Sequence, residues 1–142
     1  MTIDLPVIWA ATIGFGVFLY VALDGFDLGI GLIFPFFDRE GERQVMLNTV
    51  APVWDGNETW MVLGGASLYA VFPAAYAILL PATYLPIVAM LCGLIFRGVA
   101  FEIRAKARRT QHLWYLAFIA GSGVATFAQG VILGTLLQGI EV

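Results

Sequence analysis

The sequence predicts an all-α integral membrane protein: an antiparallel four-helix bundle whose termini both face the periplasm. Three observations predict this fold class. The residues are 61% hydrophobic and only 12% charged, whereas soluble domains are about 25% charged. Four apolar stretches are long enough to cross a bilayer, and the basic residues gather in two of the three connections between them. A soluble fold with so few charges has no means of covering this much apolar surface.

Each apolar stretch is identified by its length. The hydrocarbon core of a bilayer is about 30 Å thick, so a spanning helix needs about 20 largely apolar residues. Pro6 stands at a favourable helix start before the first stretch. We treat residues 1–142 as one transmembrane domain, and the predicted spans cover residues 7–37, 47–72, 76–101 and 113–137.

The three connections set the orientation. They are short, so neighbouring helices run antiparallel. Residues 38–44 and 102–111 hold six of the seven Lys and Arg residues, and the turn around Pro73 holds none. Because basic loops stay on the cytoplasmic side, these two connections are predicted to face the cytoplasm and both termini the periplasm.

The composition also excludes several classes of function. A net charge of −3 and a pI near 4.9 argue against a nucleic-acid partner. Cys92 is the only cysteine, so neither an internal disulfide nor a cysteine metal cluster is possible. His112 begins the fourth span beside a basic loop, and Met46, Met61 and Met90 stand among apolar residues. We therefore expect no catalytic residue and no metal or haem held by this chain's own side chains.

The first span carries two acids. Asp24 and Asp27 are three residues apart, which places them on one face of a helix. Gly25 and Gly29 form a small-xxx-small pattern in the same segment, which lets another helix approach closely.

The second span repeats this arrangement. Asp55 and Glu58 form one i,i+3 pair, and Trp54 and Asn57 form another. Counted from the connection at residues 38–44, Asp27 and Asp55 fall at nearly the same depth in the cytoplasmic half of the membrane. Acids on neighbouring helices are therefore predicted to meet.

Several acids in one place within a bilayer indicate proton handling. An ionised Asp at the centre of a spanning helix costs about 2.5–3.5 kcal/mol, and burial and like-charge repulsion both favour the protonated form. A polar subunit interface is the alternative for the same cluster. Arg97, near the cytoplasmic end of the third span, either neutralises an acid or a ligand carboxylate or extends to the lipid headgroups. Trp54 and Trp60 lie deeper than an interfacial aromatic belt and are candidate quinone contacts.

Four segments in order resemble a known family. Together they resemble subunit II of the cytochrome bd-type quinol oxidases, including the cyanide-insensitive branch, over essentially the whole chain. The segments are residues 24–29 (DGFDLG), 48–58 (NTVAPVWDGNE), 96–102 (FRGVAFE) and 136–139 (LLQG).

The resemblance implies a multi-pass subunit of a respiratory complex in the bacterial inner membrane, which oxidises quinol and reduces oxygen to water. It implies a partner, subunit I, that carries the b-type haems, haem d and the quinol-oxidising loop. This chain would be a haem-free subunit that stabilises its partner and adds acids to a proton path from the cytoplasm. Asp55 is the first candidate for that path, supported by Asp24, Asp27 and Glu58. Asn57 and Arg97 are the candidates for polar support of these acids. A small accessory subunit and a bound quinone are left open.

One departure and two rival functions remain. Members of this family have eight spans in two similar bundles, whereas four are predicted here, which corresponds to the first half of such a subunit. A proton-coupled transporter is the main rival, although Pro81 and Pro86 lie away from the acids rather than breaking a helix beside them. A purely structural membrane scaffold, whose acids only meet polar groups of a partner, is the other.

Overall fold

A computed structural model describes residues 4–104 and 106–140, and every regular element in these ranges is helical. The all-α prediction is confirmed. The elements in chain order are α1 (Leu5–Ile33), the 3-10 turn η1 (Phe34–Phe36), α2 (Glu40–Val50), α3 (Trp54–Val71), α4 (Pro73–Ala82), α5 (Tyr84–Arg104), the 3-10 turn η2 (Arg108–Thr110) and α6 (Gln111–Gln138).

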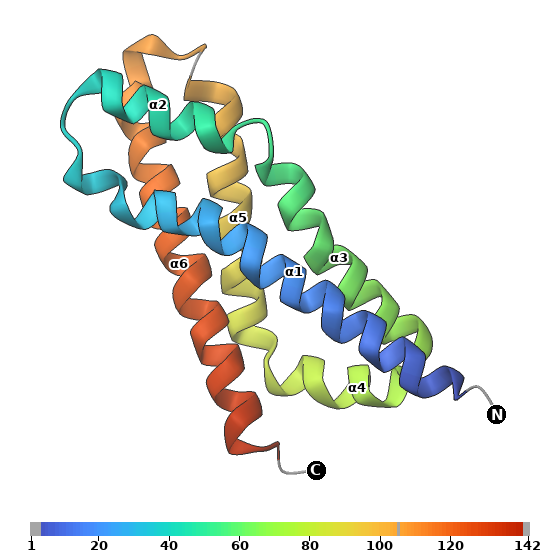
Figure 1. Ribbon diagram of the computed structural model, residues 1–142. Helices are drawn as coiled ribbons and strands as arrows, with labels where there is room; N and C mark the ends of the chain where they lie inside the picture. The colour runs from blue at the N-terminus through green and yellow to red at the C-terminus, as the bar shows by residue number, and fades with distance from the viewer. Residues whose placement is uncertain (1–3, 105, 141–142) are drawn as a thin grey trace.

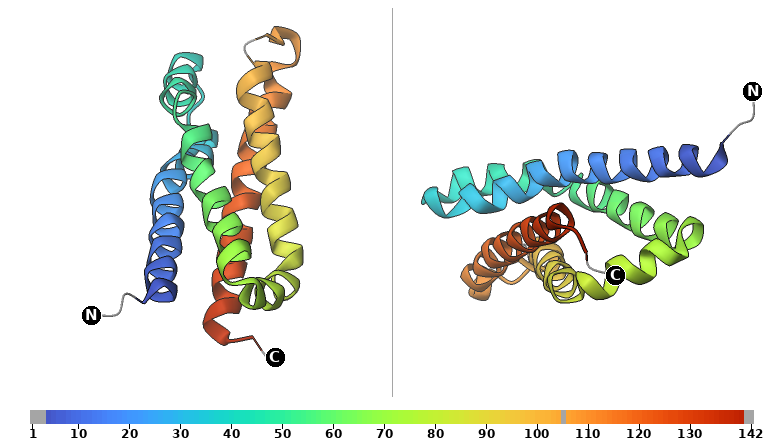
Figure 2. Two further views of the ribbon diagram at one scale, coloured as in Figure 1. Left: turned by 90° about the vertical axis from the view of Figure 1, so that its right-hand side faces the viewer. Right: turned by 90° about the horizontal axis from the view of Figure 1, so that it is seen from below.

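The long helices form two pairs. α5 packs along α6, α1 packs along α3, and α1 also contacts α6. The end-on view shows the two pairs side by side, linked by α4 (Figure 2). α1 begins and α6 ends at one end of the molecule, while α2 and the turn between α5 and α6 lie at the opposite end (Figure 1). The two basic connections therefore occupy the same end.

Three helices in the described part of the chain are long and apolar enough to cross a membrane: Leu5–Phe36, Tyr84–Arg104 and Gln111–Gln138. α3 has 18 residues and carries both Asp55 and Glu58. It lies beside α1 but is not among the three apolar spans, so the predicted four-span bundle is not confirmed. The first and last predicted spans, 7–37 and 113–137, match α1 with η1 and α6 to within two residues at each end.

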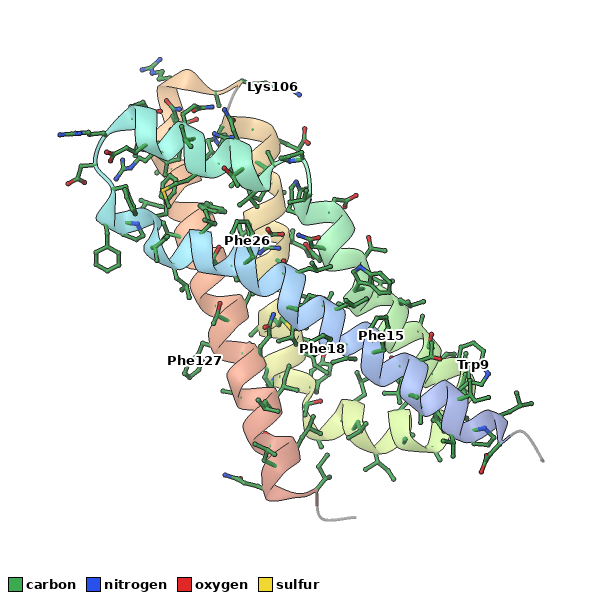
Figure 3. The ribbon with its side chains drawn as sticks, in the orientation of Figure 1. Trp9, Phe15, Phe18, Phe26, Lys106 and Phe127 are labelled. Atoms are coloured by element: carbon green, nitrogen blue, oxygen red, sulfur yellow. The ribbon has the colours of Figure 1, made fainter. Side chains whose placement is uncertain are left out.

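Large apolar side chains cover the outer surface of the helices. Trp9, Phe15, Phe18 and Phe26 on α1 and Phe127 on α6 are between 43% and 76% exposed, and Figure 3 labels them along the two helices. A soluble monomer rarely exposes a contiguous apolar surface of this extent. This surface fits a helix bundle that faces hydrocarbon.

The structure breaks the predicted span 47–72. α2 ends at Val50, residues 51–53 form a turn, and α3 begins at Trp54. Pro52 supplies the physical reason, because it has no N–H to donate back along the helix and its ring crowds the preceding turn. Residues 47–50 therefore belong to α2, which lies across the end of the bundle rather than within α3 (Figure 1).

The predicted span 76–101 is also broken. α4 ends at Ala82, Thr83 leaves helical geometry (φ −116°, ψ 17°), and α5 begins at Tyr84. Pro86 cannot continue the hydrogen-bond ladder of α4, but it is tolerated in the first turn of a new helix. α4 consequently runs across the end of the molecule, and only α5 has the length to span.

Glycines set the distance between α5 and α6. A Cβ on Gly121 would lie 2.5 Å from the carbonyl oxygen of Gly93, and a Cβ on Gly93 would lie 2.7 Å from the carbonyl oxygen of Gly121. A Cβ on Gly31 of α1 would collide with Ser122 of α6. Small residues allow this close helix packing in membranes, and the contact fixes where Arg97, one turn beyond Gly93, is placed.

Helix α2 is fixed to α6 by polar contacts. The Tyr115 hydroxyl donates to Glu40 Oε1 at 2.6 Å and accepts from Gln111 Nε2 at 2.7 Å. The Arg43 guanidinium lies 5.4 Å from the centre of the Phe34 ring and 5.7 Å from that of Tyr115. Cation–π contacts of this kind add modestly to stability. Beneath them lies a core cluster made of Phe34, Leu47, Val50, Ala100, Phe101, Tyr115 and Phe118.

We predict that Gly121→Ala destabilises the protein by about 1–3 kcal/mol, the usual cost of overpacking. The added methyl group would meet backbone atoms, which cannot move without separating α5 from α6. The melting temperature of the detergent-extracted protein measures the effect. Gly123→Ala is the matched control, because its Cβ would meet nothing within 4 Å. Equal melting temperatures for the two variants would contradict the close-packing argument.

Candidate functional site

Arg97 is the centre of a buried polar cluster. Its side chain is fully buried on α5. Its Nη2 lies 2.5 Å from Oδ1 of Asp24 on α1 and 3.6 Å from Oε2 of Glu58 on α3. The α5 guanidinium therefore joins the two helix pairs, since both acids belong to the α1–α3 pair. Of the two predicted roles for Arg97, the structure shows the one in which it neutralises an acid.

Asp27 extends the cluster by one helical turn. It is fully buried, and its Oδ2 accepts a hydrogen bond from Asn57 Nδ2 of α3 at 2.9 Å. The sequence-predicted polar support from Asn57 thus reaches Asp27, while the support from Arg97 reaches Asp24 and Glu58. α1 and α3 are thus joined directly by the Asp27–Asn57 bond, and indirectly through Arg97 of α5.

The charges in this cluster do not balance. Three carboxyl groups, of Asp24, Asp27 and Glu58, face one guanidinium. Among the described residues, five of their buried atoms have no hydrogen-bond partner: Asp24 Oδ2, Asp27 Oδ1, Glu58 Oε2, Arg97 Nε and Arg97 Nη1. An unpaired buried charge is costly. The arrangement therefore favours neutral carboxyl groups at positions that Arg97 does not neutralise, and such groups can exchange protons.

Asp55 does not join these acids. It stands in the first turn of α3 and is exposed, whereas the Glu58 side chain is only 22% exposed. The reason lies in helix geometry: at about 100° per residue, Asp55 points about 160° away from Asn57, the α3 residue that contacts Asp27. Along α3, Asp55 is two residues before Asn57, which bonds to Asp27.

Trp54 and Trp60 take part in helix packing. Trp54 stacks on Phe101 with ring centres 5.5 Å apart and planes 20° apart, and a Cβ on Gly98 would lie 2.9 Å from its ring. Trp60 is half-buried, and a Cβ on Gly16 of α1 would lie 4.0 Å from its ring. Both indoles keep some exposed surface, so neither contact excludes a bound quinone.

Sequence reasoning missed the neighbours of the cluster. Tyr20 lies one turn before Asp24, is 5% exposed, and accepts a hydrogen bond from Gln129 Nε2 of α6 at 2.6 Å. The i,i+4 spacing of Tyr20 and Asp24 was a usable signal, as was the isolated amide of Gln129 in an apolar helix. No local pattern joins Tyr20 to Gln129, because they are 109 residues apart.

His112 and the three methionines that were not expected to bind a metal or haem make none of the contacts of the polar cluster. His112 is exposed at the start of α6. Met46 packs on the core cluster at the end that α2 covers, while Met61 and Met90 belong to a second apolar cluster with Leu94. Within residues 4–104 and 106–140, no three His, Cys, Asp or Glu side chains lie together in a way that holds a metal ion.

Comparison with known proteins decides the family. A family model described as "Cytochrome bd terminal oxidase subunit II" matches residues 5–142. The chain belongs to this family. The resemblance predicted from the four sequence segments is therefore confirmed, and the matched range includes every residue of the polar cluster.

Individual relatives agree with this assignment. The chain is 36% identical to "Cytochrome bd-I ubiquinol oxidase subunit 2" of Escherichia coli (strain K12), over 96% of its own length and 37% of that protein. It is 38% identical to "Cytochrome bd ubiquinol oxidase subunit 2" of Bacillus subtilis (strain 168), over 98% of its own length and 41% of that protein. The chain thus spans about two fifths of the length of these cytochrome bd relatives.

We predict that Arg97→Leu lowers the free energy of unfolding by about 3–5 kcal/mol, because it leaves buried Asp24 without its counter-charge. The double variant Arg97→Leu/Asp24→Leu should regain much of this loss, since an apolar pair can replace a buried ion pair. Melting temperatures of the detergent-extracted protein measure both. Arg39→Leu is the control, because Arg39 forms an exposed ion pair with Glu42 worth about 0–1 kcal/mol. A double variant that is less stable than Arg97→Leu would contradict this account.

Proposed function

We propose that this chain acts as the haem-free subunit II of a bd-type terminal oxidase, which oxidises quinol and reduces oxygen to water in the bacterial inner membrane. It stabilises a haem-bearing subunit I and provides acids for a proton path from the cytoplasm. The observation that supports this proposal is the buried cluster of Asp24, Asp27, Glu58 and Arg97, found in a chain of the subunit II family.

The cluster divides into two functional parts. Asp24 is held against Arg97, so its role is to fix that guanidinium and join α1 to α5. Glu58 is partly exposed and 3.6 Å from Arg97, and Asp27 is bonded to the neutral amide of Asn57 rather than to the guanidinium. These two carboxyl groups carry the proton-exchanging role, with exposed Asp55 as the group that receives protons first.

Orientation is part of the same proposal. The basic connections at residues 38–44 and 102–111 lie at one end of the molecule (Figure 1), and Lys and Arg favour the cytoplasmic side. We infer that this end faces the cytoplasm, that both termini face the periplasm, and that α3 is the fourth span once a partner covers Asp55. A small accessory subunit and a quinone beside Trp54 or Trp60 are compatible with this arrangement.

A structural scaffold is the second candidate function. The ion pair between Arg97 and Asp24 favours it, because this contact joins helices whether or not protons move. Purification of the native complex distinguishes an oxidase subunit, whether proton-conducting or purely structural, from a proton-coupled transporter. An oxidase subunit should co-purify with a larger haem protein that has a haem d absorption band, whereas a transporter would lack the band and move a solute into vesicles.

We predict that Asp55→Asn and Glu58→Gln each slow quinol-driven oxygen consumption by about a hundredfold, the lower end of what positioned proton-transfer groups contribute. Haem content, measured by absorbance, should stay unchanged. Asp38→Asn is the control, because Asp38 is 96% exposed at the end of the molecule and contacts only Arg43 among ion-pair partners in the described residues. Normal turnover in both test variants, with haem retained, would leave only the scaffold function.

A further inference from the structure

An apolar groove runs between α5 and α6, and none of the acids of the polar cluster lines it. Its volume is about 540 Å³, within the usual range for small-molecule sites. Gly93, Gly121 and Ala120 form its floor, and the exposed side chains of Phe96, Leu113 and Val124 rise along it. Beneath this floor, the backbones of α5 and α6 lie in close contact at Gly93 and Gly121.

The length of the groove fits one membrane leaflet. On α6 it extends from Leu113 to Val124, which is about 17 Å at a rise of 1.5 Å per residue. One leaflet is half of a hydrocarbon core of about 30 Å. A second cavity of about 440 Å³ continues toward Val131, and its lining is also apolar.

Positive charge marks only one end of the groove. Lys106 and Arg109 are exposed in the turn that leads into α6, and Figure 3 shows Lys106 at that end of the molecule. Arg109 stands one helical turn before Leu113. Neither residue forms an ion pair with any residue that the structure describes. The second cavity ends among uncharged residues, so the two ends differ in the headgroup they would accept.

We propose that this groove binds an anionic phospholipid, with its phosphate at Lys106 and Arg109 and one acyl chain lying over Gly93 and Gly121. Basic residues at the ends of membrane helices attract anionic headgroups, and the apolar groove one leaflet deep matches an acyl chain. The occupant is a lipid rather than a partner helix because the charged end faces the headgroup layer. The inference does not depend on the oxidase function.

Lipid titration followed by native mass spectrometry tests the proposal on the protein purified from membranes with its natural partners. The probes are phosphatidylglycerol and phosphatidylcholine with identical acyl chains. Phosphatidylglycerol should bind more tightly. Lys106→Ala/Arg109→Ala should weaken its binding by roughly thirtyfold, since each basic residue contributes about 1 kcal/mol. Ala120→Phe, which fills the groove, should abolish that binding.

Matched controls are available on other helices. Arg39→Ala removes an exposed basic residue elsewhere, and Ala22→Phe adds a ring to an exposed position of α1; both should bind phosphatidylglycerol like the unaltered protein. Equal affinity for the two lipids, or unchanged affinity in Lys106→Ala/Arg109→Ala, would overturn the proposal. The proposal would also be overturned if the Ala120→Phe variant lost a partner subunit but still bound the lipid. Displacement of the lipid by a neutral quinone would overturn it as well. If Ala120→Phe does not fold, the proposal is tested by the Lys106→Ala/Arg109→Ala variant and by the comparison of phosphatidylglycerol with phosphatidylcholine.

Discussion

The contact between Arg97 and Asp24 is the interaction on which the arrangement of helices depends. It is buried, so the attraction is stronger than it would be in water, and the same burial makes either partner costly alone. Because Arg97 also approaches Glu58, one side chain of α5 holds both helices of the neighbouring pair. The glycine contact between α5 and α6 brings the backbone close enough for this. The close glycine packing of α5 against α6 and the position of the Arg97 guanidinium therefore depend on each other.

Around this ion pair the remaining acids have unequal surroundings. Asp27 has an amide donor, Glu58 has a distant guanidinium and partial exposure, and Asp55 is outside the cluster. One positive charge is enough to fix one carboxylate, but it does not neutralise three. A membrane protein that needed only stability would gain from apolar residues at Asp27 and Glu58, because buried polar groups without full pairing are destabilising. Folding stability therefore does not account for the acids at these two positions.

Sequence patterns located the acids because helical spacing and distance from a loop are local quantities. They placed Asp24, Asp27 and Glu58 within reach of one another. Asp55 is excluded because it points about 160° away from Asn57, the α3 residue that contacts Asp27. The breaks before α3 and α5 were missed, since hydropathy records a preference for lipid but not the direction of a helix. The bond between Tyr20 and Gln129 was beyond reach for another reason: residues distant in sequence meet only through the tertiary fold.

The aromatic cluster beneath α2 has a consequence for access. Phe34, Phe101 and Phe118 are each at most 7% exposed and lie in edge-to-face contact, so they close the end of the bundle that carries the basic connections. Of the three carboxyl groups in the polar cluster, only that of Glu58, on the flank of α3, keeps measurable exposure, at 22%. A molecule that packs against that flank of α3 would cover Glu58 and remove its remaining exposure.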